Sequence, residues 1–372
     1  MTYISRLRVV LVLLFHLSLI GLTTAAPSDP KPQPKLKPGD DSGKKLPMGI
    51  GITADGLKGL NPFRKDLPPD NQSHYKKIVT EYFSVITPGN EMKWGTIEPN
   101  QGAYQLDGAD EIMKYAQDNN KDIHIHTLFA HDQNPPWVNG MQAWELEQKM
   151  VAVLQQVISK YGKKATGMDV CNEVINESGQ LDNGPWKNAI GDGWLQGAYQ
   201  HAKIFRDQYA PNMLLFINDY NIESINQKST GLLAIAKDLH DKKLLDAVGF
   251  QCHLVAGQFP DKFKENLERF TAVGLKVALT EVDVRINLNG QQKPSQQDID
   301  KKTQDYKKVY ETCRQVRGCI SVTTWGVTPD DSWIGHVQFQ GYGAATLFEN
   351  DFSQTPAMKK LIEAGFFPKV GS

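Results

Sequence analysis

Residues 247–283, AVGFQCHLVAGQFPDKFKENLERFTAVGLKVALTEVD, contain the pattern that decides the fold. The stretch opens with an apolar, strand-length run at 247–251 and ends with a second at 277–280. Between the two runs, residues 261–273 form a longer amphipathic stretch of helical length. Two strands separated by a helix-length segment predict a parallel βαβ unit, because a tight turn cannot join parallel neighbours.

The same alternation continues along most of the chain. The expected strands are Met48–Thr53, Tyr82–Thr87, Ile123–Phe129, Gly167–Cys171, Met213–Asn218, Ala247–Gln251, Val277–Thr280 and Ile320–Trp325. The helical stretches between them include Asp107–Asn119, Gln142–Tyr161, Leu195–Tyr209, Gly231–Lys243, Asp261–Val273 and Gln297–Val316. This pattern predicts an α/β fold, the (β/α)8 TIM barrel, with an open doubly wound sheet as the alternative. No G-x-G-x-x-G or G-x-x-x-x-G-K-[ST] motif follows the first strand, which favours the barrel.

The composition limits the classes of function. The 372 residues carry 41 Lys and Arg against 42 Asp and Glu, and 40% of them are hydrophobic. Such a hydrophobic fraction supports a large core and excludes disorder over the whole length. Nucleic-acid-binding proteins normally have a basic excess, so we expect no nucleic-acid partner. The length suggests two to three domains, but barrels of this kind often exceed about 250 residues as one domain.

The N-terminal segment indicates export. Arg6 and Arg8 precede an apolar run at 9–22, and small residues follow it. This order predicts a secretory signal peptide, since the apolar run is too short to span about 30 Å of hydrocarbon as an anchor. We therefore expect a secreted, extracellular protein with no membrane partner after signal removal. The expected organisation is a signal peptide at 1–26, a Pro/Lys-rich disordered spacer at 27–46 and a single barrel domain at 47–370.

The cysteines fit an exported protein, in which a disulfide can persist. Cys313 and Cys319 flank a short turn-like stretch and are the expected pair. Cys171 and Cys252 lie in apolar strand-like runs and are expected to be buried free thiols. No Cys/His cluster has the spacing of a metal site, so we expect no metal. The sequence also holds two acceptor sequences for N-glycosylation, Asn71-Gln-Ser and Asn176-Glu-Ser.

The functional residues of a βα barrel lie at the C-terminal ends of its strands. Here these positions carry carboxylates, amides, imidazoles, a lysine and indoles. They are Asn90, Lys93, His126, Asn172, Glu173, Gln251, His253, Glu281, Asp283, Trp325 and Trp333. Amides and carboxylates bind hydroxyl groups, and indole faces cover the apolar faces of sugar rings. The set therefore predicts a polyhydroxylated ligand.

Two of these residues indicate the reaction. Glu173 and Glu281 end two different strands, and we expect both to line the solvent-open mouth of the barrel. Glycoside hydrolysis needs such a pair, because one carboxyl protonates the leaving oxygen while the other attacks the anomeric carbon or activates water. Both alternatives for the second carboxyl remain open at this point. We expect no cofactor, because these steps need only carboxyls and water.

Short motifs at the strand ends carry a family resemblance. They are Thr87-Pro-Gly-Asn-Glu-Met-Lys-Trp, Asp169-Val-Cys-Asn-Glu, Asn218-Asp-Tyr-Asn, Gly249-Phe-Gln-Cys-His, Leu279-Thr-Glu-Val-Asp and Trp325-Gly-Val-Thr with Trp333. In this order they resemble glycoside hydrolase family 10, the endo-β-1,4-xylanases, from about Met48 to Phe367. The resemblance implies a (β/α)8 barrel that hydrolyses internal β-1,4-xylosidic bonds of the polysaccharide xylan. It also implies retention of the anomeric configuration by double displacement.

The resemblance further implies residue roles. Glu173 would be the acid/base and Glu281 the nucleophile, while Asn172 would hold the sugar 2-hydroxyl. His253 would hydrogen-bond Glu281 and be oriented by Asp283, which keeps the nucleophile ionised. The residues implied to bind sugar on the non-reducing side are Asn90, Lys93, His126 and Gln251, with Trp325 and Trp333 around the reacting ring. We expect the protein to act as a monomer.

Three positions depart from the family pattern. Gly89 replaces the acidic residue usual before Asn90, Ala130 replaces a tryptophan, and Ile334 replaces an arginine common after Trp333. Loss of a charged hydrogen bond at position 89 would weaken sugar binding there by about 1.5–3 kcal/mol. A family-10 glycosidase with shifted specificity, for example toward a plant defence glycoside, is therefore the alternative function. A non-catalytic carbohydrate-binding barrel is a further alternative, although both carboxylates are present.

Overall fold

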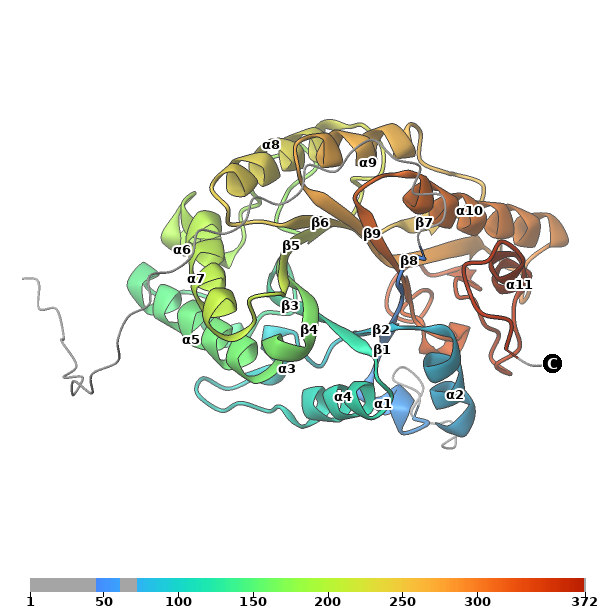
Figure 1. Cartoon of the computed structure of the whole chain (residues 1–372), viewed down its shortest axis with the longest axis horizontal. Coiled ribbons are helices and arrows are strands. Elements are labelled where there is room, and N and C mark those ends of the chain that lie inside the picture. Colours follow the sequence, from blue (N-terminus) through green and yellow to red (C-terminus); the bar gives the residue numbers. More distant parts are fainter. Residues whose placement is uncertain (1–44, 61–71, 371–372) are drawn as a thin grey trace, which may run out of the picture. The chain divides into compact units, whose positions relative to one another are not determined.

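The structure is a computed structural model that describes residues 45–60 and 72–370. Parallel strands form the centre of this part of the chain (Figure 1). The barrel strands are β1 (Met48–Ile52), β2 (Val85–Pro88), β3 (Asp122–Ala130), β4 (Ala165–Asn172), β5 (Leu214–Asp219), β6 (Ala247–Phe250), β8 (Lys276–Asn287) and β9 (Cys319–Trp325). Two short strands, β7 (His253–Val255) and β10 (Tyr342–Gly343), pair with β8. The predicted signal peptide, residues 27–44 of the predicted spacer and Asn71 lie outside the described residues.

The sheet closes on itself because β9 pairs with both β1 and β8. Val322 of β9 lies beside Met48 on one side and beside Leu279 on the other. The other strands follow chain order around the barrel from β1 to β6 and then β8. A closed parallel sheet with helices between its strands is the (β/α)8 barrel that the sequence predicts. The alternative of an open doubly wound sheet is wrong.

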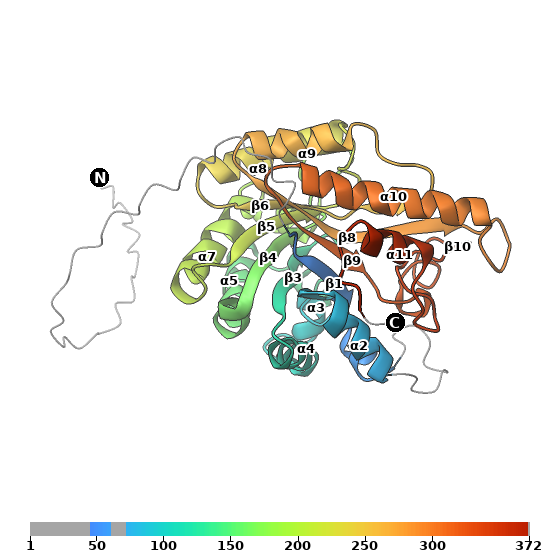
Figure 2. The ribbon, with the colours of Figure 1, turned by 45° about the vertical axis from the view of Figure 1, so that its right-hand side comes forward.

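Helices cover the outside of the barrel (Figure 2). They are α1 (Ala54–Leu57), α2 (Gln72–Tyr82), α3 (Trp94–Ile97), α4 (Asp107–Asp118), α5 (Ala143–Tyr161), α6 (Pro185–Ile190), α7 (Trp194–Tyr209), α8 (Gln227–Asp241), α9 (Phe263–Ala272), α10 (Gln296–Gln315) and α11 (Pro356–Glu363), with 3-10 helices η1 (Pro136–Val138), η2 (Gly162–Lys164) and η3 (Pro329–Asp331). In α5 the buried residues include Leu146, Met150, Val153 and Val157, which recur every three to four positions. This spacing places one apolar stripe of the helix against the barrel, as the amphipathic pattern of the sequence predicts.

Two strands show the largest differences from their predicted boundaries, and the other strands differ by at most two residues at either end. Tyr82 ends α2 instead of opening β2. β8 continues to Asn287, seven residues beyond the predicted Thr280, because β7 and β10 pair with its extension. Within this extension the charged residues alternate with buried valines and isoleucine, which is the period of a strand. The predicted strand ends too early because only its first part is a continuous apolar run.

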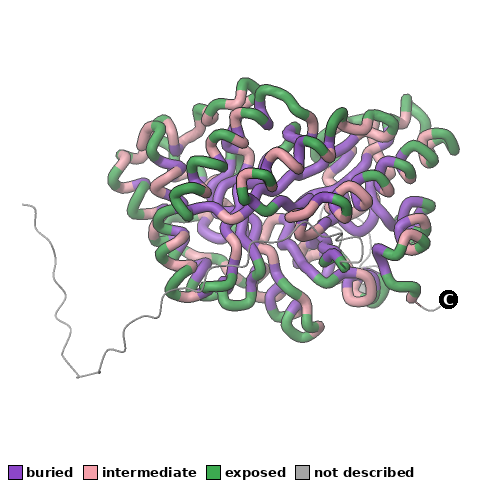
Figure 3. Tube along the Cα trace, turned by 45° about the horizontal axis from the view of Figure 1, so that its top comes forward, coloured by how far each residue is buried: buried purple, intermediate pink, exposed green. Residues whose placement is uncertain are grey.

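The core continues to the N-terminal edge of the barrel. Leu46, which the prediction placed in the spacer, is buried in the main apolar cluster. Figure 3 shows buried residues along the strands and on the inner sides of the helices. The structure joins Cys313 at the end of α10 to Cys319 at the start of β9 by a disulfide, and Cys171 and Cys252 are free and buried. Among the described residues, no helix is long and apolar enough to span a membrane.

Candidate active site

The C-terminal ends of the strands bring the predicted site residues together. Asn90 and Lys93 follow β2, His126 lies in β3, and Asn172 ends β4 directly before Glu173. The others are Gln251 after β6, His253 in β7, Glu281 and Asp283 in β8, Trp325 at the end of β9 and Trp333 in the segment after it. Hydrogen bonds and ion pairs connect seven of these side chains and Asn218 into one cluster; the seven are Asn172, Glu173, Gln251, His253, Glu281, Asp283 and Trp333. Asn90 and Lys93 form a second group, and His126 and Trp325 form a third. The charges of Lys93 and His126 act on Glu281.

Asn218, at the penultimate position of β5, lies at the centre of the cluster. Its Nδ2 donates to Asn172 Oδ1 at 2.9 Å and to Glu281 Oε1 at 2.7 Å. Its Oδ1 accepts from the Thr280 hydroxyl at 2.6 Å, which fixes the orientation of the amide. The motif Asn218-Asp-Tyr-Asn contains this residue but does not by itself indicate its role. The strand-end position was the signal that could have identified it.

Glu173 lies one residue beyond β4, where the backbone turns away from the barrel. Its φ is +58°, and its N–H donates to the carbonyl oxygen of Asn218 at 2.9 Å. Gln251 Nε2 donates to Glu173 Oε1 at 2.8 Å and approaches Asn172 Oδ1 at 3.3 Å. Amide groups therefore connect the two carboxyls of the site through Gln251, Asn172 and Asn218. Glu173 itself is only partly buried.

Glu281 is 5% exposed, so the expectation that it lines a solvent-open mouth is wrong. It lies inside β8, and the side chains of neighbouring strand ends cover it. Burial by itself would raise the pKa of the Glu281 carboxyl. The positive potential of His126, the hydrogen bond from His253 and the charge of Lys93 outweigh burial and lower that pKa. The site thus keeps Glu281 ionised.

His253 lies between two carboxylates. Its Nδ1 is 2.9 Å from Asp283 Oδ2, and its Nε2 is 3.5 Å from Glu281 Oε2. Burial opposes the imidazolium, but Asp283 and Glu281 raise the pKa of His253 to about 10. Trp333 Nε1 donates to the same Asp283 oxygen at 2.9 Å, and its ring lies edge-on to that of His253. Asp283 therefore orients both an imidazole and an indole.

Lys93 adds a charged group to the site. Its Nζ donates to Asn90 Oδ1 at 3.0 Å and to Gln133 Oε1 at 2.6 Å. Burial lowers the pKa of Lys93, while Glu281 and Glu173 oppose that change. Gln133 could not be predicted from sequence, because nothing in the local pattern indicates that a residue 40 positions away contacts Lys93.

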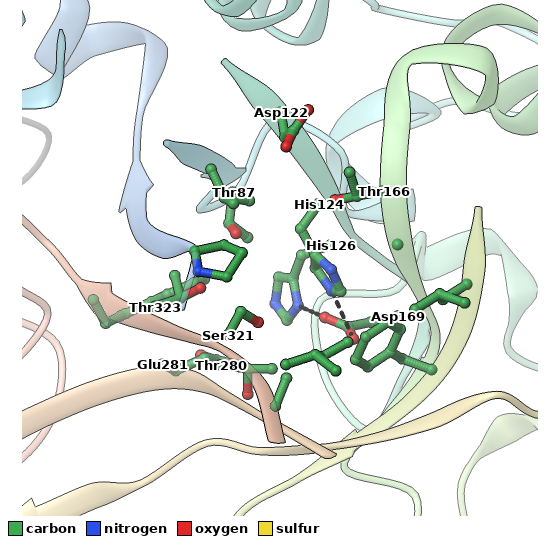
Figure 4. A pocket seen from close by; sticks show the side chains of 18 residues that line it. Thr87, Asp122, His124, His126, Thr166, Asp169, Thr280, Glu281, Ser321 and Thr323 are labelled. Atoms are coloured by element: carbon green, nitrogen blue, oxygen red, sulfur yellow. Dashed lines mark hydrogen bonds and ion pairs between the residues drawn. The ribbon is translucent and has the colours of Figure 1, made fainter. Parts of the chain in front are cut away.

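A cavity of about 140 Å³ lies inside the barrel (Figure 4). Its lining runs from Asp122, at the start of β3, to Glu281. In its wall, Asp169 contacts two imidazoles through different oxygens. His124 Nε2 lies 2.9 Å from Asp169 Oδ1, and His126 Nδ1 lies 2.9 Å from Asp169 Oδ2. Burial opposes the charge on Asp169, but the two imidazoles lower its pKa to about 2. Asp169 thereby holds His126, which also lies edge-on to the Trp325 ring at 5.4 Å between centroids.

The three departures lie around this cluster. Gly89 donates its N–H to Ile52 O at 2.7 Å, and a Cβ at Gly89 would meet that oxygen at 3.3 Å. Ala130 is buried, and its carbonyl oxygen accepts from Trp186 Nε1 at 3.2 Å. Ile334 is buried as well. None of the three positions therefore carries a polar side chain that could bind a sugar hydroxyl.

The second acceptor sequence for glycosylation lies in the loop after Glu173. Asn176 Oδ1 accepts from the Ser178 hydroxyl at 2.7 Å, from Ser178 N–H and from Gln180 N–H at 3.1 Å. The side chain is therefore turned toward its own loop. Among residues 45–60 and 72–370, no group of three His, Cys, Asp or Glu side chains has the geometry of a metal site.

Comparison with known proteins identifies the family. Residues 63–364 match the family model described as "Glycosyl hydrolase family 10". "Endo-1,4-beta-xylanase B" of Thermotoga neapolitana is 32% identical over 79% of this chain and 85% of its own length. "Endo-1,4-beta-xylanase" of Agaricus bisporus is 31% identical over 76% of this chain and 84% of its own length. The crystal structure of a glycosylated family-10 endo-β-1,4-xylanase from Gloeophyllum trabeum superposes with a TM-score of 0.79 at 31% identity, covering 87% of this chain and 98% of that one. The chain belongs to glycosyl hydrolase family 10 and is a retaining glycoside hydrolase.

Proposed function

We propose that this protein is a secreted endo-β-1,4-xylanase in which Glu281 is the nucleophile and Glu173 the acid/base. The observation that carries the proposal is the pair of carboxyls that side-chain amides connect by hydrogen bonds. Glu281 is enclosed and held ionised by cationic neighbours, whereas Glu173 is partly exposed. The names of the relatives support the substrate. Xylanase 10B of Thermotoga petrophila, solved in complex with xylobiose, is 29% identical with a TM-score of 0.76 and covers 86% of this chain and 93% of that one.

The first step uses both carboxyls. An oxygen of ionised Glu281 attacks the anomeric carbon, and an ester bond forms there as the glycosidic bond breaks. The leaving oxygen takes the proton of Glu173 and departs as a free hydroxyl. Asn218 and His253, which hold the two oxygens of Glu281, keep the attacking carboxylate in one orientation.

The second step regenerates the enzyme. Glu173, now a carboxylate, takes a proton from water as the water oxygen attacks the anomeric carbon. The ester bond breaks, Glu281 becomes a carboxylate again, and the proton remains on Glu173. Two displacements at one carbon restore its original configuration. The partly exposed position of Glu173 gives it access to the water that this step requires.

The other side chains bind sugar in this proposal. Asn172, which is fixed by Asn218 and Gln251, holds the 2-hydroxyl of the reacting sugar. The residues for hydroxyls on the non-reducing side are Asn90, Lys93, His126 and Gln251, to which the structure adds Gln133. Trp325 and Trp333 enclose the reacting ring. The enzyme works as a monomer and needs no cofactor.

A second candidate function is cleavage of a different glycoside. Ala130 leaves no aromatic side chain at a position where the family has a tryptophan, and Gly89 leaves no acidic side chain at the position before Asn90. Both losses weaken the non-reducing side of the cleft, so a short glycoside would lose less binding free energy than a polysaccharide. Both carboxyls are retained, which argues against a barrel that only binds carbohydrate.

Export and processing complete the proposal. A signal peptide at 1–26, a spacer that starts at 27 and a catalytic domain that extends to 370 would give an extracellular enzyme. Asn71 and Asn176 would then meet the glycosylation machinery. N-terminal sequencing of the secreted protein and its mass before and after glycosidase treatment test these two points. A mature N-terminus at Met1 would contradict export by this route.

The central test is hydrolysis of arabinoxylan by the purified mature protein, with Glu281→Gln as the matched control. We expect rapid release of mixed oligosaccharides, which only internal cleavage produces, and no release by the control. Release of a single small product would indicate that the enzyme cleaves from the end of the xylan chain. No release by folded wild-type protein would favour the second candidate, and small plant glycosides would then be the substrates to assay.

A further inference from the structure

The direction of Glu173 depends on an irregular loop. Residues 173–184 join β4 to α6 and contain only one isolated bridge, between Ile175 and Leu181. Glu173 has a φ of +58°, in the left-handed region that a non-glycine residue adopts at a cost in free energy. Contacts from outside the loop must therefore hold the backbone at this position.

Helix α8 provides one such contact. A Cβ built on Gly231 would lie 2.0 Å from the carbonyl oxygen of Gly179 and 2.5 Å from its Cα. Real Cβ atoms do not approach other atoms so closely, so only glycine at position 231 permits this packing. The loop after Glu173 thus lies backbone to backbone on the second turn of α8.

Lys228 provides a second contact from the same helix. Its side chain is 1% exposed, and its Nζ lies 2.9 Å from Asp219 Oδ1, 3.3 Å from Glu177 Oε1 and 3.4 Å from the centre of the Tyr220 ring. Both desolvation and the helix dipole oppose an ammonium buried in the first turn of a helix. Its three partners offset this penalty, and one of them, Glu177, belongs to the loop that carries Glu173.

Asp219 connects the ammonium of Lys228 to Glu173. Its Oδ2 accepts from the N–H of Ile175 at 3.3 Å, two residues beyond Glu173. Burial raises the pKa of the Asp219 carboxyl, Lys228 opposes that rise, and the nearby charge of Glu173 adds to it. Without Lys228, the buried Asp219 carboxyl would therefore lose the cation that holds it beside the loop.

We propose that Lys228 is a positioning residue for the acid/base. It holds the loop that carries Glu173 through its ion pairs with Asp219 and Glu177, and the close packing of the loop against Gly231 supports the same backbone conformation. The proposal rests on the role of Glu173 proposed above. Its consequence is selective, because misplacement of Glu173 slows only the steps in which Glu173 transfers a proton. Attack by Glu281 on a substrate that needs no protonation would proceed almost unchanged.

The experiment compares kcat/KM for two aryl β-xylobiosides, one with a dinitrophenyl and one with an unsubstituted phenyl leaving group. For Lys228→Met we expect kcat/KM to fall about 30-fold on the phenyl substrate and less than about threefold on the dinitrophenyl substrate, since only the poorer leaving group needs the proton. The ratio of the two constants is independent of the concentration of folded enzyme. It therefore remains informative even if the variant folds poorly.

A second variant separates positioning from stability. Gly231→Ala favours the helix by about 1 kcal/mol in intrinsic propensity, yet it pushes the loop off α8. We expect the same leaving-group-dependent loss as in Lys228→Met. The matched controls are Lys237→Met, which removes an exposed lysine that pairs with Asp241 on the same helix, and Gly197→Ala in α7, where a Cβ meets open space. Both should keep the wild-type ratio.

The outcomes distinguish this inference from the proposed function. If wild-type protein cleaves the aryl xylobiosides while Lys228→Met and Gly231→Ala lose activity equally on both, the role of Lys228 is merely structural and the inference is wrong. Unchanged activity in both variants would overturn it too. If folded wild-type protein cleaves neither substrate, the proposed xylanase function itself fails, and the role assigned to Lys228 fails with it.

Discussion

The site holds its two carboxyls in opposite ways. Glu281 lies within β8, is 5% exposed, and has an amide on one carboxylate oxygen and an imidazole near the other. Glu173 lies beyond the end of β4, has a left-handed backbone conformation and receives one hydrogen bond from Gln251. One carboxyl is thus built into the barrel, and the other is carried by a loop at its rim.

This difference matches the different demands of the two proposed roles. A nucleophile must be ionised before substrate arrives and must not move, so a strand surrounded by cationic groups suits it. An acid/base must give up a proton, regain one and reach water within each cycle, so a partly exposed position suits it. Substitutions should therefore affect the two carboxyls in different patterns, and those patterns are measurable.

The largest effect is expected for Glu281→Ala. Removal of the proposed nucleophile would prevent formation of the ester, so kcat/KM should fall by at least about 10⁴-fold on every substrate, whatever its leaving group. Steady-state kinetics on xylan and on aryl xylobiosides measure this, with Glu268→Ala on α9 as a control for an exposed carboxylate. Retention of more than a few per cent of wild-type activity would show that another group attacks.

Glu173→Ala should produce a selective loss. We expect kcat/KM to fall about 10²–10⁴-fold on xylan but to remain near the wild-type value on a dinitrophenyl xylobioside, because that leaving group departs without protonation. The same pair of substrates measures both values. Equal losses on the two would place Glu173 outside the acid role.

The pH dependence of stability tests whether His253 is held as a cation beside Glu281. Its folded pKa is about 10, above the ordinary value near 6.5, because Asp283 and Glu281 outweigh burial. The stability that its charge contributes is therefore fully present below about pH 6.5 and is lost as the pH rises toward 10. The melting temperature of wild type relative to His253→Gln should decrease over this range. A difference that is constant from pH 6 to pH 10 would mean that His253 is not held as an imidazolium.

Gly89→Glu should have the smallest effect, and on binding alone. A carboxylate restored at position 89, before Asn90, should lower KM for xylo-oligosaccharides by about tenfold with little change in kcat, since a charged hydrogen bond contributes about 1.5–3 kcal/mol. Gly89→Ala is the control, because it adds the Cβ that meets Ile52 O without adding the charge. An equal change in both variants would assign the effect to packing.

The sequence predicted those parts of the molecule whose signals are local. The barrel strands are short apolar runs, and the two carboxyls directly follow or interrupt such runs, so periodicity locates them. The burial of Glu281 was not predicted, because it depends on side chains from other strands, such as Asn218 and His253.

Lys228 shows most clearly what local reading misses. In sequence it is an ordinary charged residue three positions before the predicted helix at Gly231–Lys243, and the structure extends that helix back to Gln227. Its burial depends on a loop about 50 residues earlier in the chain, which brings Glu177 to its ammonium. Gln133 was missed for the same reason, since its partner Lys93 lies 40 positions away. Contacts of this kind exist only after the barrel closes.

The most direct test of the central claim is covalent trapping of the nucleophile. A xylobioside with fluorine at the 2-position and a dinitrophenyl leaving group should form the ester quickly and hydrolyse slowly, because fluorine disfavours the positive charge of both transition states while the leaving group rescues only the first. Mass spectrometry of the intact protein and of its peptides then locates the sugar. We predict one xylobiosyl group per protein, attached to Glu281. A sugar attached to any other residue, or a reaction that proceeds with inversion and no adduct, would contradict the account.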